Sequence, residues 1–189
     1  MVLLSVLFLS VVIGLLQGGR LSALGLHPWR HRFLPFVALA LQVVAFLPDE
    51  SASRVAQIFA ASLHISSYVL LLAFVWANGT TPWVWLIGAG LAANGIAIVA
   101  NGGFMPVAPF ALAPSAPVRT LGVYNNSVLM TPGTRLWFLG DVVHLPHWFP
   151  VGALALQAFS IGDALIGIGV FLVVQGVMRQ PGPNLETQG

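Results

Sequence analysis

Polar residues divide the chain into five apolar stretches of helical length. They cover residues 2–17, 33–47, 55–77, 82–100 and 160–178. A helix rises about 1.5 Å per residue, so about 20 residues cross the hydrocarbon core of a bilayer. The last three stretches meet that length, whereas the first two require local thinning of the bilayer. Because an open sheet leaves backbone groups unpaired in lipid, the pattern predicts an all-α bundle of about five transmembrane helices.

The organisation around these stretches predicts a single transmembrane domain over residues 1–179. No basic segment precedes the first stretch, and Gln17-Gly-Gly-Arg20 is a poor cleavage site, so we interpret it as a helix and not as a signal peptide. Residues 101–157 are rich in aromatic side chains, which favours a cap on the membrane surface with one short interfacial helix around residues 135–143. Residues 180–189 contain Pro181, Gly182 and Pro183 and are expected to form a flexible tail.

The composition supports the membrane class. Only seven arginines and five acidic residues carry formal charge among 189 residues, and 58% of the residues are hydrophobic. Mean hydropathy is +0.92. A soluble domain of this size cannot bury so much apolar surface, so the composition excludes soluble, disordered and nucleic-acid-binding classes. The chain has no cysteine, which excludes disulfides, thiolate metal sites and cysteine nucleophiles.

The positions of the arginines predict an orientation. Arg20, Arg30 and Arg32 lie between the first two stretches, and Arg179 follows the last one. The positive-inside rule places these segments in the cytoplasm. Five crossings then put the N-terminus and the cap outside and the C-terminus in the cytoplasm.

Small residues concentrate in the fourth and fifth stretches and predict close helix packing. They allow helix backbones to approach each other in lipid, so these two helices are expected inside the bundle. The residues are Gly88, Ala89, Gly90, Ala92, Ala93 and Gly95 in the fourth stretch and Gly162, Ala164, Gly167 and Gly169 in the fifth.

Two aspartates are the candidate catalytic residues. Asp141 and Asp163 each follow an apolar residue and a glycine, and each precedes two apolar residues. Two neighbouring carboxylates share a proton, so one can activate water while the other donates to a carbonyl. Asn101, Arg135 and Ser160 are the candidate substrate-binding or supporting residues around them.

The same residues also have structural interpretations, which stay open beside the catalytic one. Ser160-x-x-Asp163 before an apolar run is a capping-box pattern. Asp141 could pair with Arg135, six positions earlier.

Histidines offer only weak metal or cofactor candidates. His144 and His147 follow Asp141, but Pro146 breaks a helix that would align them, so no metal is predicted. His64 lies inside the third stretch, and no other stretch offers a second histidine for a haem. We interpret His64 as a hydrogen-bonded structural residue and predict no cofactor.

Three motifs resemble those of an uncharacterised bacterial family of multi-pass membrane proteins, a domain of unknown function. They are Asn101-Gly-Gly-Phe-Met-Pro, Thr134-Arg-Leu-Trp-Phe-Leu-Gly-Asp141 and Phe159-Ser-Ile-Gly-Asp163. The likeness covers most of the chain. It implies a bacterial cytoplasmic membrane as the location and supplies no activity.

Part of the chain also resembles lipoprotein signal peptidase (signal peptidase II). Gly140-Asp141 and Phe159-Ser-Ile-Gly-Asp163-Ala are similar to its last two motifs, which implies that Asp141 and Asp163 form a catalytic dyad near the outer face. Asn101-Gly-Gly is similar to that family's Asn-Gly motif, which implies a substrate-orienting role for Asn101. The chain departs from the family at Ser160, where the family has Asn, and at Thr134-Arg135, where it has Asp-Arg. The family also has four spans, one of which separates the Asn motif from the Asp motifs.

The leading functional prediction is non-enzymatic, because helix-packing residues are many and reactive residues are few. We expect a membrane subunit or scaffold that binds a lipid, an apolar cofactor or a partner protein, with membrane lipids around it and no nucleic acid. The alternative is an outer-face aspartyl hydrolase that uses Asp141 and Asp163. A small transporter is the third hypothesis, weakened because no stretch has an acid or arginine at its centre.

Overall fold

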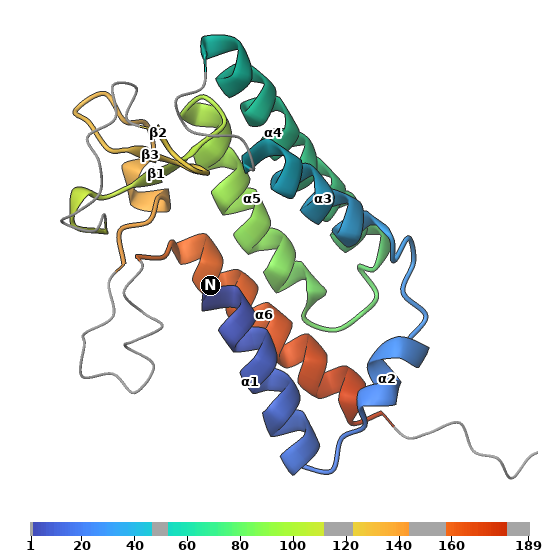
Figure 1. Ribbon diagram of the computed structural model, residues 1–189. Coiled ribbons are helices and arrows are strands. Elements are labelled where there is room, and N and C mark those ends of the chain that lie inside the picture. Colours follow the sequence, from blue (N-terminus) through green and yellow to red (C-terminus); the bar gives the residue numbers. More distant parts are fainter. Residues whose placement is uncertain (1, 47–52, 112–122, 144–157, 181–189) are drawn as a thin grey trace, which may run out of the picture.

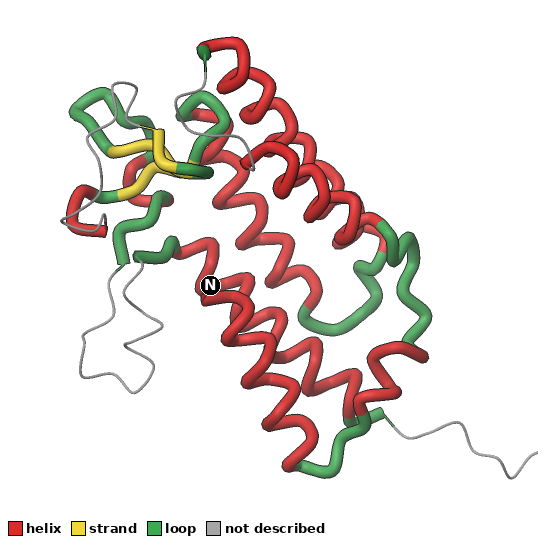
Figure 2. Tube along the Cα trace, viewed as in Figure 1, coloured by secondary structure: helices red, strands yellow, loops and turns green. Residues whose placement is uncertain are grey.

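A computed structural model describes residues 2–46, 53–111, 123–143 and 158–180. In these ranges the protein is a bundle of helices with a small β-sheet at one end (Figures 1 and 2). The helices are α1 (Val2–Leu16), α2 (Leu21–Leu26), α3 (Leu34–Phe46), α4 (Arg54–Ala77), α5 (Val84–Ala100) and α6 (Ile161–Met178).

The five long helices fall on the five apolar stretches, with ends within two residues of the predicted ones. The short helix α2 was not predicted and lies between the first two stretches. Helices α4 and α6 are long and apolar enough to cross a membrane, whereas α1, α3 and α5 are apolar but shorter.

The segment predicted as a cap contains a sheet that the sequence did not predict. Strands β1 (Met105–Val107), β2 (Val123–Tyr124) and β3 (Ser127–Leu129) are arranged in the order β1-β3-β2. Strand β1 runs parallel to β3, and β2 runs antiparallel to it. The sheet lies where α5 ends and α6 begins (Figure 1), and we call this end of the bundle the cap end. The opposite end, beside α2, is called the far end.

The short helix expected around residues 135–143 is not formed. Only a 3-10 turn, η2 (Trp137–Leu139), occurs there. The left-handed backbone of Leu136, at φ 51°, and the extended backbone of Gly140 limit it on both sides. Asp141 continues as an isolated parallel bridge to Val107, so the chain leaves η2 in extended form.

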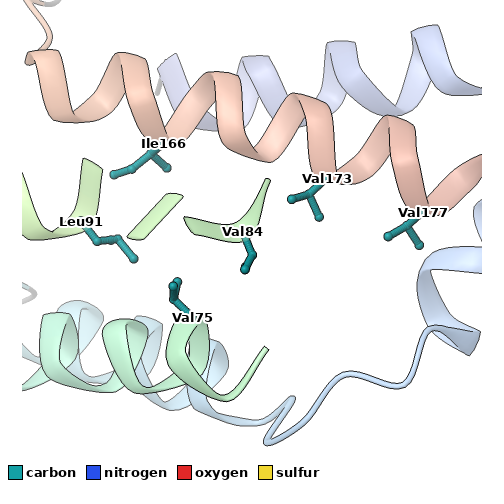
Figure 3. Packing of buried hydrophobic residues seen from close by; sticks show 6 residues of the cluster. All are labelled: Val75, Val84, Leu91, Ile166, Val173 and Val177. Carbon is teal, nitrogen blue, oxygen red and sulfur yellow. The ribbon is translucent and has the colours of Figure 1, made fainter. Parts of the chain in front are cut away.

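Helices α5 and α6 form the closest contact of the bundle, as the small residues predicted. A Cβ atom at Gly90 would overlap the carbonyl oxygen of Gly162, and one at Gly169 would lie 2.7 Å from Cγ1 of Ile87. The main apolar core lies along the same contact and includes Val75, Val84, Leu91, Ile166, Val173 and Val177 (Figure 3).

Polar side chains link two other helix pairs. Nε2 of Gln175 in α6 donates to the main-chain oxygen of Ser10 in α1, at 2.6 Å. Nε2 of Gln42 in α3 donates to Oγ of Ser67 in α4, at 2.9 Å. Such bonds fix how one apolar helix is placed along another, because a slip would leave buried polar groups unpaired.

Candidate functional site

Five polar residues from four parts of the chain meet at the cap end. Asn94 comes from α5, Ser160 and Asp163 from the start of α6, Tyr68 from α4, and Asp141 from the cap. We call this group the polar junction. It contains both aspartates that the sequence singled out.

Ser160 and Asp163 form the capping box that their spacing predicted. Oγ of Ser160 accepts a hydrogen bond from the main-chain N–H of Asp163 at 2.9 Å. The main-chain N–H of Ser160 donates to Oδ2 of Asp163 at 3.3 Å. These bonds satisfy amide groups that the first turn of a helix leaves unpaired, and the acid suits the positive end of the helix dipole.

Asn94 connects this cap to α5. Its Nδ2 donates to Oδ1 of Asp163 at 2.8 Å, and its Oδ1 accepts from Oγ of Ser160 at 2.8 Å. The approach depends on Gly162, because a Cβ there would overlap Oδ1 of Asn94. Both carboxylate oxygens of Asp163 therefore accept hydrogen bonds inside the protein.

The main chain of Asp141 is held by strand β1. Its N–H donates to the carbonyl oxygen of Pro106 at 2.8 Å, and its carbonyl oxygen accepts from Ala108 N–H at 3.1 Å. A Cβ at the preceding Gly140 would lie 2.5 Å from that Pro106 oxygen, so glycine is needed for this approach. Two residues later, Val143 pairs with Phe159, which connects the segment to the start of α6.

The Asp141 carboxyl group lacks hydrogen bonds of the kind that the Asp163 carboxylate accepts. Its Oδ1 is buried and has no hydrogen-bond partner. Burial, and secondarily the negative charge of Asp163, raise the pKa of Asp141 to about 7. The structure thus brings the two aspartates close enough to interact electrostatically. The arginine that could have paired with Asp141, Arg135, forms no ion pair with it, and its side chain is exposed.

Asn101 and Arg135 meet through main-chain atoms. Nδ2 of Asn101 donates to the carbonyl oxygens of Arg135 and Ala97, each at 2.8 Å, and its Oδ1 accepts from Arg135 N–H at 3.0 Å. The amide of Asn101 is therefore used to hold the cap on the end of α5. A substrate-binding role for these two residues stays a prediction.

His64 also supports the cap. Its ring is buried, and Nδ1 lies 2.8 Å from the carbonyl oxygen of Gly103, just after α5. The rings of Phe46 and Tyr68 pack edge-on against it. These contacts fit the structural interpretation of His64. His144 and His147 lie outside the described residues, within which no group of three His, Asp or Glu side chains could hold a metal.

Tyr68 and Asn94 are junction residues that do not belong to the site residues predicted from the sequence. The Tyr68 hydroxyl group lies close enough to Asn94, Asp163 and Asp141 for each of them to act on it electrostatically. Asn94 is a buried amide in an otherwise apolar helix, and that isolation was the signal that could have identified it. Tyr68 carried no comparable signal.

An apolar groove of about 420 Å³ lies between α4 and α5 and is lined in part by Tyr68. Its other walls are formed by apolar side chains and glycine, including Leu72, Ala92 and Gly95. Val69, Ile96 and Val99 line it and are each more than half exposed, so the groove is open along the side of the bundle. Tyr68 is the residue that the groove and the polar junction share.

The fold and the junction define a helical protein whose small β-sheet is fixed to the end of the helix pair α5 and α6. The chain belongs to a family of unknown function, DUF5317, whose profile matches residues 28–175. That range includes the whole polar junction. An uncharacterized protein of Thermotoga maritima is 30% identical over 124 residues, which cover 66% of this chain and 66% of that one. No solved structure matches.

These comparisons confirm the resemblance to a family of unknown function. None of them shows the similarity to signal peptidase II.

Proposed function

We propose that this protein is a non-enzymatic integral membrane protein that binds the apolar chain of a lipid-like molecule in the groove between α4 and α5. In this proposal α1, α3, α4, α5 and α6 cross a bacterial cytoplasmic membrane. The lengths and apolar sequences of α4 and α6 support the crossing. So do the many exposed large apolar side chains on α1, α3 and α4, among them Phe8, Phe36 and Phe59.

Exposed aromatic side chains at both ends of the bundle support the same placement. Trp76, Trp83 and Trp85 lie at the far end, and Trp137 and Phe138 lie on the cap. Tryptophan and other aromatic residues favour the two membrane–water interfaces. Two such belts, separated by apolar helices, are expected of a protein that spans the bilayer.

The orientation follows from the exposed arginines at the far end, which are Arg20, Arg30, Arg32 and Arg179. The positive-inside rule assigns that end to the cytoplasm and the cap end to the outer face. The N-terminus, where α1 begins, is then outside, and the groove opens to the outer half of the bilayer.

The groove is the observation that carries the binding function. It offers apolar walls to the lipid phase, with the half-buried Tyr68 as one of its lining residues, and such a concave apolar surface suits the chain of a lipid-like molecule. The junction favours binding over catalysis, because both oxygens of Asp163 already accept internal hydrogen bonds.

The test is binding of monopalmitoylglycerol to the full-length protein in detergent, measured by native mass spectrometry. Gly95→Leu fills the groove, since a Cβ at Gly95 already lies 3.4 Å from Cδ1 of Tyr68. Gly176→Leu is the matched control, because a Cβ at Gly176 meets open space and this residue lies outside the groove. We expect Gly95→Leu to lower binding about tenfold or more, as a loss of about 1.4 kcal/mol would, and Gly176→Leu to preserve it. Equal binding by both variants would contradict the proposal.

An aspartyl hydrolase is the second candidate, favoured by the different environments of the two carboxyl groups. Near neutral pH Asp141 is partly protonated, because burial and, secondarily, the charge of Asp163 raise its pKa to about 7. Asp163 would then take a proton from water as the water oxygen adds to a carbonyl carbon, and Asp141 would protonate the carbonyl oxygen. Turnover of a lipid-modified peptide by the wild type, lost in Asp141→Asn, would establish this alternative over simple binding.

A further inference from the structure

We infer that the far end carries a binding site for an anionic phospholipid, in which Arg20 and Arg179 bind the head-group phosphate and exposed leucines beside them contact the acyl chains. Figure 1 shows the end of α1, the short helix α2 and the end of α6 together at this end of the bundle. The site is separate from the groove between α4 and α5, and it goes beyond the function proposed above.

The end of α6 fixes Arg20 beside Arg179. The main-chain N–H of Arg20 donates to the carbonyl oxygen of Met178 at 2.9 Å, and its Nη2 donates to the carbonyl oxygen of Gln180 at 3.0 Å. Gly19 allows this approach, because a Cβ there would lie 3.0 Å from Cβ of Met178. Since Met178 and Gln180 flank Arg179 in the sequence, the two arginines are neighbours although they come from opposite ends of the chain.

The guanidinium group of Arg179 is positioned by a buried polar side chain. Its Nη2 donates to Oε1 of Gln175 at 3.0 Å. Gln175 is only 7% exposed, and its Nε2 donates to the main-chain oxygen of Ser10 in α1 at 2.6 Å. The amide of Gln175 cannot turn over without losing both bonds, so Arg179 is held at the contact between α1 and α6.

Most of the hydrogen-bonding capacity of the two guanidinium groups is unused within the described residues. Each group has five N–H donors, and each makes one side-chain hydrogen bond there, to a neutral oxygen. Both side chains are exposed, and the acidic residues that the structure describes, Asp141 and Asp163, lie at the cap end. Two neighbouring guanidinium groups with free donors favour an oxyanion, and phosphate matches their bidentate geometry.

Exposed leucines beside the arginine pair indicate that the anion is part of a lipid. Leu16, at the end of α1, is 81% exposed, and Leu21, the residue after Arg20, is 56% exposed. Helix α2 buries none of its residues, so it lies on the surface beside α6. A free phosphate gains nothing from these leucines, and an acidic peptide leaves them in water. A phospholipid offers its acyl chains to the leucines and its phosphate to the arginines.

The test compares phosphatidylglycerol with phosphatidylcholine, both with one palmitoyl and one oleoyl chain, on the full-length protein in a nonionic detergent. Native mass spectrometry gives the two dissociation constants. We expect phosphatidylglycerol to bind about tenfold more tightly, because the choline group compensates the phosphate charge. Raising ammonium acetate from about 0.05 M to about 0.5 M should reduce this preference severalfold, since salt screens exposed charges. Equal binding of the two lipids at the lower salt concentration would overturn the inference, whether or not any variant folds.

Arg20→Gln/Arg179→Gln tests which arginines form the site. This variant should bind phosphatidylglycerol about tenfold more weakly and phosphatidylcholine as the wild type does. Arg30→Gln/Arg32→Gln is the matched control, because it removes the same charge from the far end. Arg30 is held at the end of α4 by two main-chain hydrogen bonds to Asn78, which the substitution keeps. The control should retain the preference, and an equal loss in both variants would overturn the assignment to Arg20 and Arg179.

Two soluble competitors distinguish the source of the anion. Glycerol 1-phosphate carries the charge without acyl chains, and a short polyglutamate peptide carries it as an acidic protein segment would. Neither should displace phosphatidylglycerol from the protein. Displacement by glycerol 1-phosphate would identify a free phosphate as the ligand, and displacement by the peptide would identify a protein partner. Either result would overturn the lipid assignment.

This site and the groove can be tested separately. Gly95→Leu, which fills the groove, should keep the preference for phosphatidylglycerol, and Arg20→Gln/Arg179→Gln should keep the binding of monopalmitoylglycerol. If Gly95→Leu removes the preference for phosphatidylglycerol, the anionic lipid binds at the groove, and the inference is wrong while the proposed function stands. If Gly95→Leu and Gly176→Leu bind monopalmitoylglycerol equally, the proposed function is wrong and the arginine site is unaffected.

Discussion

The side chain of Asn94 in α5 lies across the start of α6 and bonds both partners of its capping box. It donates to Oδ1 of Asp163 and accepts from Oγ of Ser160, each at 2.8 Å. A capping box usually involves one helix end only, but here the two hydrogen bonds of Asn94 connect it to a second helix. Burial and, secondarily, this same carboxylate raise the pKa of Asp141, so the junction also links the helices to the cap.

Removing the Asn94 amide should weaken the whole bundle. Asn94→Ala leaves Oδ1 of Asp163 and Oγ of Ser160 without this partner in a buried setting. The expected loss is about 2–4 kcal/mol of unfolding free energy, since each unpaired buried group costs about 1–3 kcal/mol. Chemical denaturation in detergent, followed by circular dichroism, measures it.

Ser62→Ala is the control for this prediction, because Ser62 is exposed and bonds only within its own helix, to Ile58. It should change the unfolding free energy by no more than about 0.5 kcal/mol. Equal stability of the two variants would show that the Asn94 amide does not hold the helices together.

Two glycines on α6 should respond oppositely to the same substitution. Gly162→Ala places a methyl group on Oδ1 of Asn94 and must push α5 and α6 apart, at about 1–3 kcal/mol. Gly176→Ala meets open space and should stabilise the helix by about 0.5–1 kcal/mol. Thermal unfolding of the two variants gives the comparison. A stabilising Gly162→Ala would mean that the helices are not in close contact there.

The helices could be predicted from the sequence because their signals are local. Helix α4 ends at Ala77, directly before Asn78-Gly79, and each apolar run is limited in a similar way by polar or small residues. The capping box was predictable for the same reason, since Ser160 and Asp163 are three positions apart.

The cap and the junction depend on contacts between distant residues, so the sequence gave little sign of them. The strands have two or three residues, too few for an alternating pattern, and β1 contains Pro106. Asn94 meets its partner Asp163 69 positions later. In the sequence it stands among small and apolar residues of α5 that predict packing and no site.

Two neighbouring glycines after α5 allow the cost of backbone strain to be measured apart from the cost of crowding. Gly102 and Gly103 both have a left-handed backbone, at φ 74° and 93°. A Cβ at Gly102 meets open space, whereas one at Gly103 overlaps Ala61. Gly103 is also the residue whose carbonyl oxygen contacts Nδ1 of His64. Gly102→Ala should therefore cost about 1 kcal/mol from strain alone, and Gly103→Ala about 1–3 kcal/mol more. Equal losses in denaturant unfolding would remove crowding against Ala61 as the cause.

Stability should fall as the pH rises toward neutrality. The pKa of Asp141 is about 7 in the folded protein against 3.8 in the unfolded chain, so the folded state binds the proton more tightly. The stabilisation is complete below about pH 4 and is lost progressively until the carboxyl group ionises in the folded state, near pH 7. Each pH unit in that interval removes up to about 1.4 kcal/mol, and denaturant unfolding at several pH values measures the slope.

Asp141→Asn provides the control for this slope, because its amide stays neutral at every pH and has nearly the same shape. The variant should lose most of the decline between about pH 4 and pH 7 and should be more stable than the wild type above neutrality. If the slope persists unchanged in Asp141→Asn, the proton is bound elsewhere.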